Sequence, residues 1–300
     1  MGDIFTCTTL NNGMKKALFH SLIILSLCSC AILARKNQTV PPTVDVGACK
    51  KLKGEVLVYA VFTESKQLPQ WTGFDMHSTK DSLKRALAWL ENKATENGQS
   101  VHFKTIWHKE EKIKPIESNL PNQNLNSMVF RPGFISQIDR WSNKIAKQMV
   151  RELPTDTTKI LIKRIEEREK LISRLRQIYN VENVALLFFI NNHGRNDASV
   201  TLHTGDNKSP EYCVITEKRA SVIAHEVLHL FGALDFYLHP GMMKFRQRKH
   251  VFQANKEFKD DIMSHPARDI NQLDIEDLTA YLIGWRDDFD NKFNSLVYGR

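Results

Sequence analysis

Residues 225–235 read HEVLHLFGALD, and this stretch carries more chemical information than any other part of the 300-residue chain. It fits the pattern H-E-x-x-H-x-x-G-x-x-D. His225 and His229 are four residues apart, so on a helix their imidazoles lie on one face, one turn from each other. At this spacing each imidazole can offer one nitrogen to a tetrahedral zinc ion. The stretch therefore predicts a helix that binds a metal.

The helix predicted around this motif runs from about residue 217 to residue 231, with Thr216 as its N-cap. Its apolar residues occur on nearly every side, at Ala220, Val222, Ile223, Ala224, Val227, Leu228, Leu230 and Phe231. This pattern predicts a buried helix. Two imidazoles and a carboxylate in a buried helix are costly unless something binds them. We therefore expect the polar residues of the motif to be functional.

Three further residues of the motif have distinct expected roles. Glu226 is angled to reach a water molecule at the metal rather than the metal itself, which predicts a general base. Gly232 readily adopts the left-handed conformation, so it predicts the end of the helix and a reversal of the chain. The reversal returns Asp235 as the third ligand, and three protein ligands leave a position open for water, as in catalytic zinc sites. Its competitors as third ligand are His239, Asp260 and Asp261.

The motif resembles that of the metzincins, zinc endopeptidases whose zinc-binding helix ends at the motif glycine, and its aspartate form resembles the snapalysin-like branch. The resemblance implies a Met-turn, a tight turn beneath the zinc. Residues 261–264 (DIMS) are similar to it, with Met263 as the structural methionine. In some metzincins a tyrosine near the zinc lies two residues after this methionine. The chain has His265 there, which the resemblance suggests as an oxyanion or substrate contact.

The remaining pattern predicts an α/β fold of the α+β kind, with a mixed, twisted sheet. Strands are expected over residues 55–62, 101–107, 184–190, 199–203 and 211–215. The stretch 184–190 (VALLFFI) is entirely apolar, which predicts a central strand covered on both faces. The resemblance makes 199–203 the antiparallel edge strand that pairs with an extended peptide substrate.

Two further helices are expected in this layout. One is capped by Ser78 or Thr79 and runs through about residue 94, with apolar residues on one face. The other is a closing helix capped by Asp274 that runs through about residue 283, with Leu273 and Leu278 as a hydrophobic staple.

The segment at about 110–182 is a helical insertion in this layout. It contains a loop rich in Pro and Asn and two expected helices, at about 133–152 and 156–179, which are divided at Pro154. The second helix includes a charged run, KRIEEREK, at 163–170. A solvated helix face with ion pairs between residues four apart is the simpler interpretation of this run. A partner-binding hairpin is the alternative.

The N-terminus predicts export. Residues 17–34 are apolar and lie between two pairs of basic residues, 15–16 and 35–36, as in a signal peptide. Four interpretations remain open: a signal peptide cleaved after Ala31, a lipoprotein signal acylated at Cys30, an uncleaved membrane anchor, and a buried helix. Residues 1–13 either extend the charged region or belong to an over-extended reading frame. We thus expect a targeting segment at 1–34, a linker at 35–51 and a catalytic domain at 52–300, outside the cytoplasm.

Composition narrows the expected partners. The chain has a formal net charge of +8 and a pI near 9.2, but it lacks a nucleic-acid motif or an aromatic-basic stripe. The positive net charge is therefore better explained as a contribution to solubility, and no nucleic-acid partner is expected. Of five cysteines, Cys49 and Cys213 lie outside the targeting segment. They either pair in an oxidising compartment or remain free, since the sequence does not show that they meet.

Together these features predict a zinc endopeptidase that is secreted or attached to the cell envelope as a lipoprotein. Zinc would be held by His225, His229 and Asp235, and Glu226 would act as the general base. We expect a monomer that acts on a protein or peptide substrate, with membrane attachment, if any, through the N-terminus. Two alternatives remain: a non-catalytic, zinc-bearing surface protein that binds a partner, and a zinc hydrolase of a non-peptide substrate.

Overall fold

The computed structural model describes residues 49, 51–109, 114–120, 133–154, 166–192, 199–204, 209–237 and 245–298. The chain divides into two compact units, 1–44 and 45–300, and every described residue lies in the second. The expected targeting segment, most of the linker and His239 are outside the described residues. Within the described ranges, no helix has both the length and the apolar character needed to cross a membrane.

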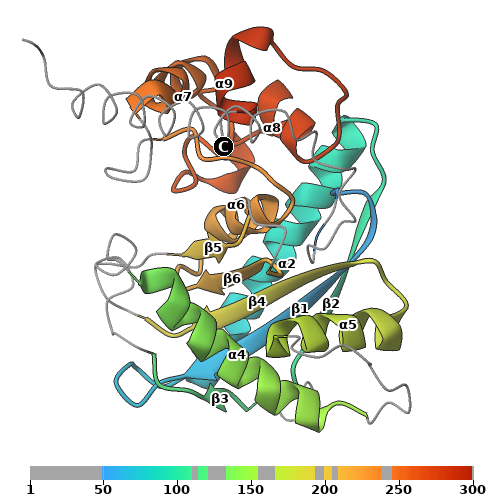
Figure 1. Ribbon diagram of the computed structural model, residues 1–300, viewed down its shortest axis with the longest axis vertical. Helices are drawn as coiled ribbons and strands as arrows, with labels where there is room; N and C mark the ends of the chain where they lie inside the picture. The colour runs from blue at the N-terminus through green and yellow to red at the C-terminus, as the bar shows by residue number, and fades with distance from the viewer. Residues whose placement is uncertain are drawn as a thin grey trace, which may run out of the picture. The chain divides into compact units, whose positions relative to one another are not determined.

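A mixed sheet forms the centre of the second unit (Figure 1). Its order is β2-β1-β4-β6-β5, and β3 pairs with the end of β1. All pairs are parallel except β5 with β6, which is antiparallel. The expected α/β fold with a mixed sheet and an antiparallel edge strand is thus confirmed. The strands are β1 (Gly54–Glu64), β2 (Val101–Trp107), β3 (Ile116–Glu117), β4 (Asn183–Ile190), β5 (Val200–Leu202) and β6 (Tyr212–Ile215).

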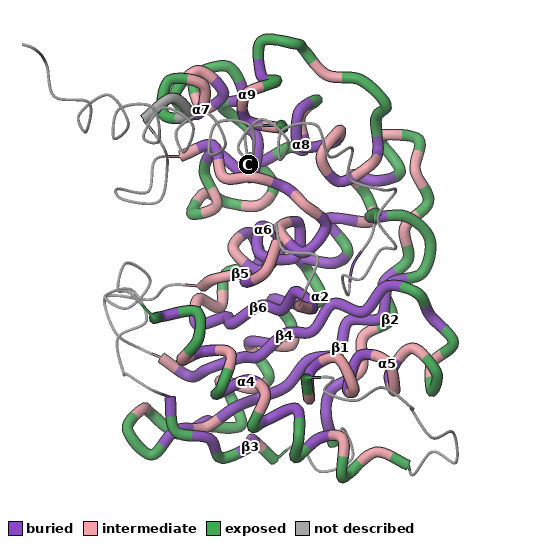
Figure 2. The backbone as a smooth tube through the Cα atoms, in the orientation of Figure 1, coloured by how far each residue is buried: buried purple, intermediate pink, exposed green. Residues whose placement is uncertain are grey.

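The two central strands are buried along almost their whole length (Figure 2). All eight residues of β4 are buried, as the apolar run at 184–190 predicts for a strand covered on both faces. In β1, the alternation of inward and outward residues is also absent, since Val56–Phe62 are all buried. Helices therefore have to cover both faces of the sheet.

Two helix pairs provide this cover. Helices α4 (Phe134–Glu152) and α5 (Glu167–Tyr179) cross one face, and α2 (Gly73–Glu96) and α6 (Ala220–Leu230) pack together on the other (Figure 1). Helix α5 begins at Glu167 rather than at the expected residue 156, and residues 155–165 lie outside the described part of the chain. The C-terminal part lies beyond α6. It contains α7 (Phe245–Glu257), η2 (Ile270–Gln272), α8 (Asp277–Leu282), η3 (Asn291–Phe293) and α9 (Asn294–Val297). Helix α7 is not among the helices expected from the sequence, because it is strongly polar.

The start of α2 differs from the sequence-based expectation. Its N-cap is Thr72 rather than Ser78 or Thr79, because Thr72 and Asp75 form a capping box. Thr72 Oγ1 accepts from the backbone N–H of Asp75 at 3.1 Å, and the Asp75 carboxylate accepts from the N–H of Thr72 at 3.3 Å. The Thr79 hydroxyl donates to the carbonyl of Asp75 inside the helix instead. Helix α2 is therefore more than one turn longer at its start than expected.

The predicted starts of two other helices were also wrong. Helix α6 begins after Arg219, not after Thr216, whose buried hydroxyl has no hydrogen-bond partner among the described residues. Helix α8 begins after Glu276 rather than Asp274, because the N–H of Glu276 donates to the carboxylate of Asp261 at 2.8 Å. At α6 the expected capping hydrogen bond is absent, and at α8 a carboxylate that is distant in sequence sets the start of the helix.

The described part of the charged run, residues 166–170, is not simply a solvated face. Arg168 is fully buried and donates to the Asp139 carboxylate, so it ties α5 to α4. The same Asp139 oxygen accepts from the Tyr212 hydroxyl of β6 at 3.0 Å and lies 2.8 Å from His203 Nε2, just after β5. Helices α4 and α5 are therefore bound to the edge of the sheet by a shared carboxylate, which the four-apart ion-pair pattern did not predict.

Cys49 and Cys213 are both buried free thiols, so the disulfide that the sequence left open does not form. Cys49 donates to the carbonyl of Val184 at 3.4 Å, and Cys213 donates to the carbonyl of Glu226 at 3.3 Å. Burial raises the pKa of both thiols well above the usual value, because it disfavours the thiolate.

Candidate metal centre

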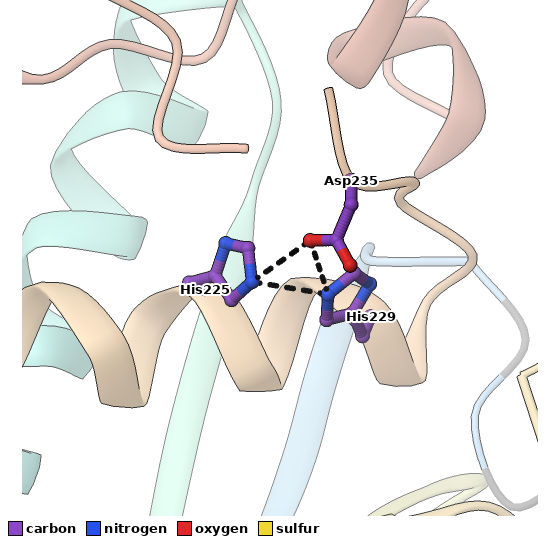
Figure 3. Close-up of side chains that lie close together, drawn as sticks. All are labelled: His225, His229 and Asp235. Carbon is purple, nitrogen blue, oxygen red and sulfur yellow. Dashed lines mark hydrogen bonds and ion pairs between the residues drawn. The ribbon is translucent and has the colours of Figure 1, made fainter. Parts of the chain in front are cut away.

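Three ligand-type atoms converge at the C-terminal end of α6 (Figure 3). The Nε2 atoms of His225 and His229 are 3.1 Å apart, and Asp235 Oδ1 lies 3.2 Å from the first and 3.1 Å from the second. A tetrahedral zinc ion with bonds of about 2.0–2.1 Å holds its ligand atoms about 3.3–3.4 Å apart. The triangle is thus close to the size that zinc requires.

Local backbone geometry brings these atoms together. The two histidines are one turn apart on α6, and their rings meet edge to face with centroids 4.5 Å apart. Gly232 then reverses the chain with a φ of +98°, a conformation that glycine adopts without steric cost. Past the reversal, the N–H of Phe236 donates to the carbonyl of Met263 at 2.9 Å. This bond fixes the backbone beside Asp235.

Both imidazoles are oriented by their second nitrogen. His225 Nδ1 lies 3.2 Å from the carbonyl oxygen of Ile262, and His229 Nδ1 lies 2.9 Å from that of Ala233. A carbonyl oxygen only accepts, so each Nδ1 carries the hydrogen and a neutral ring leaves a lone pair on Nε2. Three lone-pair atoms then face one another across about 3 Å, which is unfavourable without a cation or a proton between them. The donor set therefore fits a divalent metal.

The charges of the three side chains also favour a positive charge at the point where the three atoms meet. Burial disfavours a charged imidazole, but the carboxylate of Asp235 outweighs it and raises the pKa of His229 to about 9. Burial likewise disfavours the carboxylate, yet the two histidines hold the pKa of Asp235 well below its usual value. In the absence of a metal, a proton is thus favoured where the three atoms meet. A metal that binds there has to displace it.

Glu226 lies on α6 next to the first histidine and is 5% exposed. Its Oε2 accepts a hydrogen bond of 2.6 Å from Thr201 Oγ1 on β5. The negative charge of Glu226 also acts on His229 and Tyr237, so the carboxylate is near the cluster without being one of its three atoms. This is the arrangement expected for a base that acts beside a metal rather than on it.

Tyr237 is a further residue of the centre that the sequence analysis missed. Its hydroxyl lies 3.4 Å from His225 Nε2, and its ring is inclined by 27° to that of His225, with centroids 6.0 Å apart. Burial, together with the charges of Asp235 and Glu226, raises the pKa of the hydroxyl, which keeps it a neutral donor. Its place two residues after Asp235, on the returning chain, is the signal that identifies it.

Residues 261–264 form a tight turn that packs against the centre. The N–H of Ser264 donates to the carbonyl of Asp261 at 3.0 Å, and the N–H of Met263 donates to the Asp261 carboxylate at 2.7 Å. Met263 is fully buried. The carbonyls of Ile262 and Met263 hold His225 and Phe236, so the turn orients one ligand directly and another through the backbone.

Comparisons with known proteins do not assign the chain. No protein-family model matches it, and no curated protein matches it. One solved structure that it resembles, titled "Structure of a chaperone-substrate complex", has 10% sequence identity and a TM-score of 0.32. The match covers 61% of this chain and 24% of that chain.

The remaining candidate residues that the structure describes are not part of the cluster. His265 is exposed, and its carbonyl accepts from the N–H of Arg268 at 3.1 Å. Asp260, a competitor for the third-ligand position, pairs with Arg268 at 2.8 Å. Asp261 is buried and accepts backbone hydrogen bonds in the turn. Among the described residues, Asp235 is thus the carboxylate that joins the two histidines, and Tyr237 rather than His265 lies beside them.

Proposed function

We propose that this protein is a zinc-dependent endopeptidase of the metzincin type, with His225, His229 and Asp235 as the ligands. The observation that carries the proposal is the convergence of the two Nε2 atoms and one carboxylate oxygen at 3.1–3.2 Å. The orientation of both rings by backbone carbonyls supports it, because second ring nitrogens bound in this way are usual for metal-ligating histidines. The turn at 261–264 supports a Met-turn around Met263.

The proposed chemistry divides among the side chains of the site. A zinc ion bound there supplies Lewis-acid activation of water and of the peptide carbonyl. Glu226 takes a proton from the attacking water and returns it to the leaving amine. The Tyr237 hydroxyl, which lies 3.4 Å from His225 Nε2, donates a hydrogen bond to the developing oxyanion. Tyr237 thus has the role that the resemblance suggested for His265.

A peptide substrate is supported by the edge strand. Strand β5 is the last strand of the sheet order and is antiparallel to β6. An extended chain can add to such an edge through backbone hydrogen bonds, which leaves side-chain pockets to provide specificity. The strand also contains Thr201, whose hydroxyl contacts Glu226, so a peptide on this edge would pass close to the proposed base.

Incubation with casein tests this proposal. Purified protein loaded with one equivalent of zinc is expected to cleave casein, and a chelator is expected to abolish cleavage. Glu226→Gln is expected to retain zinc and to lower the rate by about 10²–10⁴-fold, because only the base is removed. Glu217→Gln, just before α6, is the matched control and is expected to cleave like wild type.

The outcomes distinguish the alternatives. A zinc-loaded wild-type protein that cleaves no peptide but hydrolyses an ester or amide of a small molecule would indicate a non-peptide hydrolase. Zinc binding without any hydrolysis would indicate a surface binding protein. A Glu226→Gln variant that cleaves like wild type would contradict the mechanism.

We also propose that the protein is exported, since the motif follows a signal-like segment at 15–36. Mass spectrometry of the native N-terminus tests this. A mature chain that begins near residue 30 or 32 is expected, and a diacylglycerol mass on Cys30 would select the lipoprotein form. A cytoplasmic chain that still begins at Met1 would contradict export.

A further inference from the structure

We infer that Thr201, on the edge strand β5, is a positioning residue that fixes the carboxylate of Glu226. The inference rests on the proposed function, since it concerns the residue proposed as the base. Thr201 Oγ1 lies 2.6 Å from Glu226 Oε2. Hydroxyl–carboxylate hydrogen bonds of 2.5–2.7 Å are charge-assisted and roughly twice as strong as neutral ones.

The single proton of the Thr201 hydroxyl has three neighbours. Besides Glu226 Oε2, they are the backbone carbonyl of Glu226 at 3.0 Å and Cys213 Sγ at 3.1 Å. The carboxylate oxygen is the closest and the only charged one, so the proton is committed to it. The Cys213 thiol lies 3.3 Å from the same backbone carbonyl and can donate there. The contacts are thus mutually compatible.

The sheet register creates this arrangement. Thr201 pairs with Cys213 across β5 and β6, so both side chains point to one face of the sheet, toward α6. The neighbouring pair, Leu202 and Tyr212, points to the other face, where Tyr212 reaches Asp139 of α4. Glu226 therefore packs over a cross-strand pair of small polar side chains. A shift of β5 by one residue relative to β6 would bring Val200 or Leu202 to this face in place of Thr201.

One carboxylate oxygen of Glu226 is anchored, and the other remains available. Within the described ranges, Glu226 Oε1 makes no hydrogen bond. A glutamate has three side-chain torsions, so an unanchored carboxylate would sample several positions. A base that takes a proton from water has to lie within hydrogen-bond reach of it. Thr201 thus restricts the Glu226 carboxylate and leaves Oε1 to receive the proton.

The test replaces the hydroxyl without changing the shape of the side chain. Thr201→Val keeps the β-branch, and is expected to keep zinc content and KM but lower kcat by about 10–100-fold, since part of the base contribution is lost. Thr201→Ser keeps the hydroxyl and is expected to recover most of kcat. Thr63→Val is the matched control, because Thr63 Oγ1 donates to the carbonyl of Phe189 at 3.0 Å and is also buried. It is expected to lower stability only.

A second readout does not depend on activity. In crystal structures of the zinc-loaded proteins, Glu226 Oε2 is expected within hydrogen-bond distance of residue 201 in wild type and in Thr201→Ser. In Thr201→Val the carboxylate is expected to occupy new or multiple positions. Thr201→Ala serves the same purpose if the valine variant does not fold.

The results separate this inference from the proposed function. A wild-type protein that cleaves no peptide overturns the proposed function, while the crystal structures still decide whether Thr201 positions Glu226. A wild-type protein that cleaves peptides, together with a Thr201→Val variant of equal kcat or an unmoved carboxylate, overturns the positioning role alone. Loss of kcat in the serine variant equal to that in the valine variant would also overturn it.

Discussion

His229 Nδ1 donates to the carbonyl of Ala233, only four residues further along the chain, at 2.9 Å. The bond spans Gly232, whose φ of +98° makes the sharp reversal between them. The same reversal returns Asp235 to a point 3.1 Å from His229 Nε2. One glycine therefore controls both the orientation of one expected ligand and the arrival of another.

Gly232→Ala is accordingly expected to weaken zinc binding although residue 232 is not a ligand. An alanine at positive φ costs about 1–2 kcal/mol, and relief of this strain would move the carbonyl of Ala233. Loss of such an orienting bond typically lowers metal affinity by about 10–100-fold. Competition with a chromophoric chelator measures the change. Gly98→Ala is the matched control, since Gly98 has a φ of +67° at the end of α2 and open space around it, and an equal loss of zinc affinity there would contradict the explanation.

Asp235→Ala is expected to reduce zinc affinity by about 100-fold or more, because a ligand rather than an orienting group is lost, and to abolish hydrolysis. Asp235→His is expected to restore part of the binding, since imidazole nitrogen is also a zinc ligand. Isothermal titration with zinc measures both variants. Asp260→Ala and His239→Ala remove the competing ligands and are expected to bind zinc like wild type. A normal affinity in Asp235→Ala would refute the assignment.

Tyr237→Phe removes one hydroxyl and keeps the ring that lies against His225. We expect zinc affinity to remain nearly unchanged and kcat to fall by about 100-fold, the usual effect of losing one oxyanion donor. Tyr281→Phe is the control, because its hydroxyl lies at the surface, 3.3 Å from that of Tyr298. If both variants keep wild-type kcat, Tyr237 has no part in the reaction, and a large loss of zinc affinity would make it a ligand instead.

Asp139→Ala is expected to destabilise the fold by about 3–5 kcal/mol, since it leaves the buried charge of Arg168 without its main partner. Burial disfavours the Asp139 carboxylate, but His203 and Arg168 outweigh this and lower its pKa to about 2. A lowered folded-state pKa stabilises the protein above the unfolded value near 4, and this contribution is lost as the pH falls through about 2. Urea unfolding at several pH values should thus show the difference between wild type and variant shrinking below pH 4.

Glu166→Ala supplies the control for this prediction. Glu166 also pairs with Arg168, at 2.7 Å, but its side chain is 46% exposed. We expect Glu166→Ala to lower the free energy of unfolding by less than about 1 kcal/mol, because exposed ion pairs usually contribute little to stability. Equal losses in the two variants would show that Asp139 has no special role in joining helices α4 and α5 to the sheet.

Much of the fold was predictable because its signals are local. Seven of the eight buried residues of β4, 184–190, form one apolar run, and the bounds of β2 were predicted without error. Helix starts were less predictable. Thr216 has the side chain of an N-cap, but α6 starts three residues later, and α8 starts where Asp261 accepts from the N–H of Glu276. Such starts depend on groups that are distant in sequence, which no residue pattern within the helix encodes.

The sequence by itself determined that His225 and His229 lie on one face of a buried helix, because a spacing of four residues matches the helical period. It also determined the reversal at Gly232, since glycine adopts positive φ without steric cost. Only the tertiary structure decided which other side chains meet them. Thr201 reaches Glu226 because of the register between β5 and β6, and Tyr237 reaches His225 because of the path of the returning chain. Strand order and loop path bring distant residues together, and neither follows from a local period.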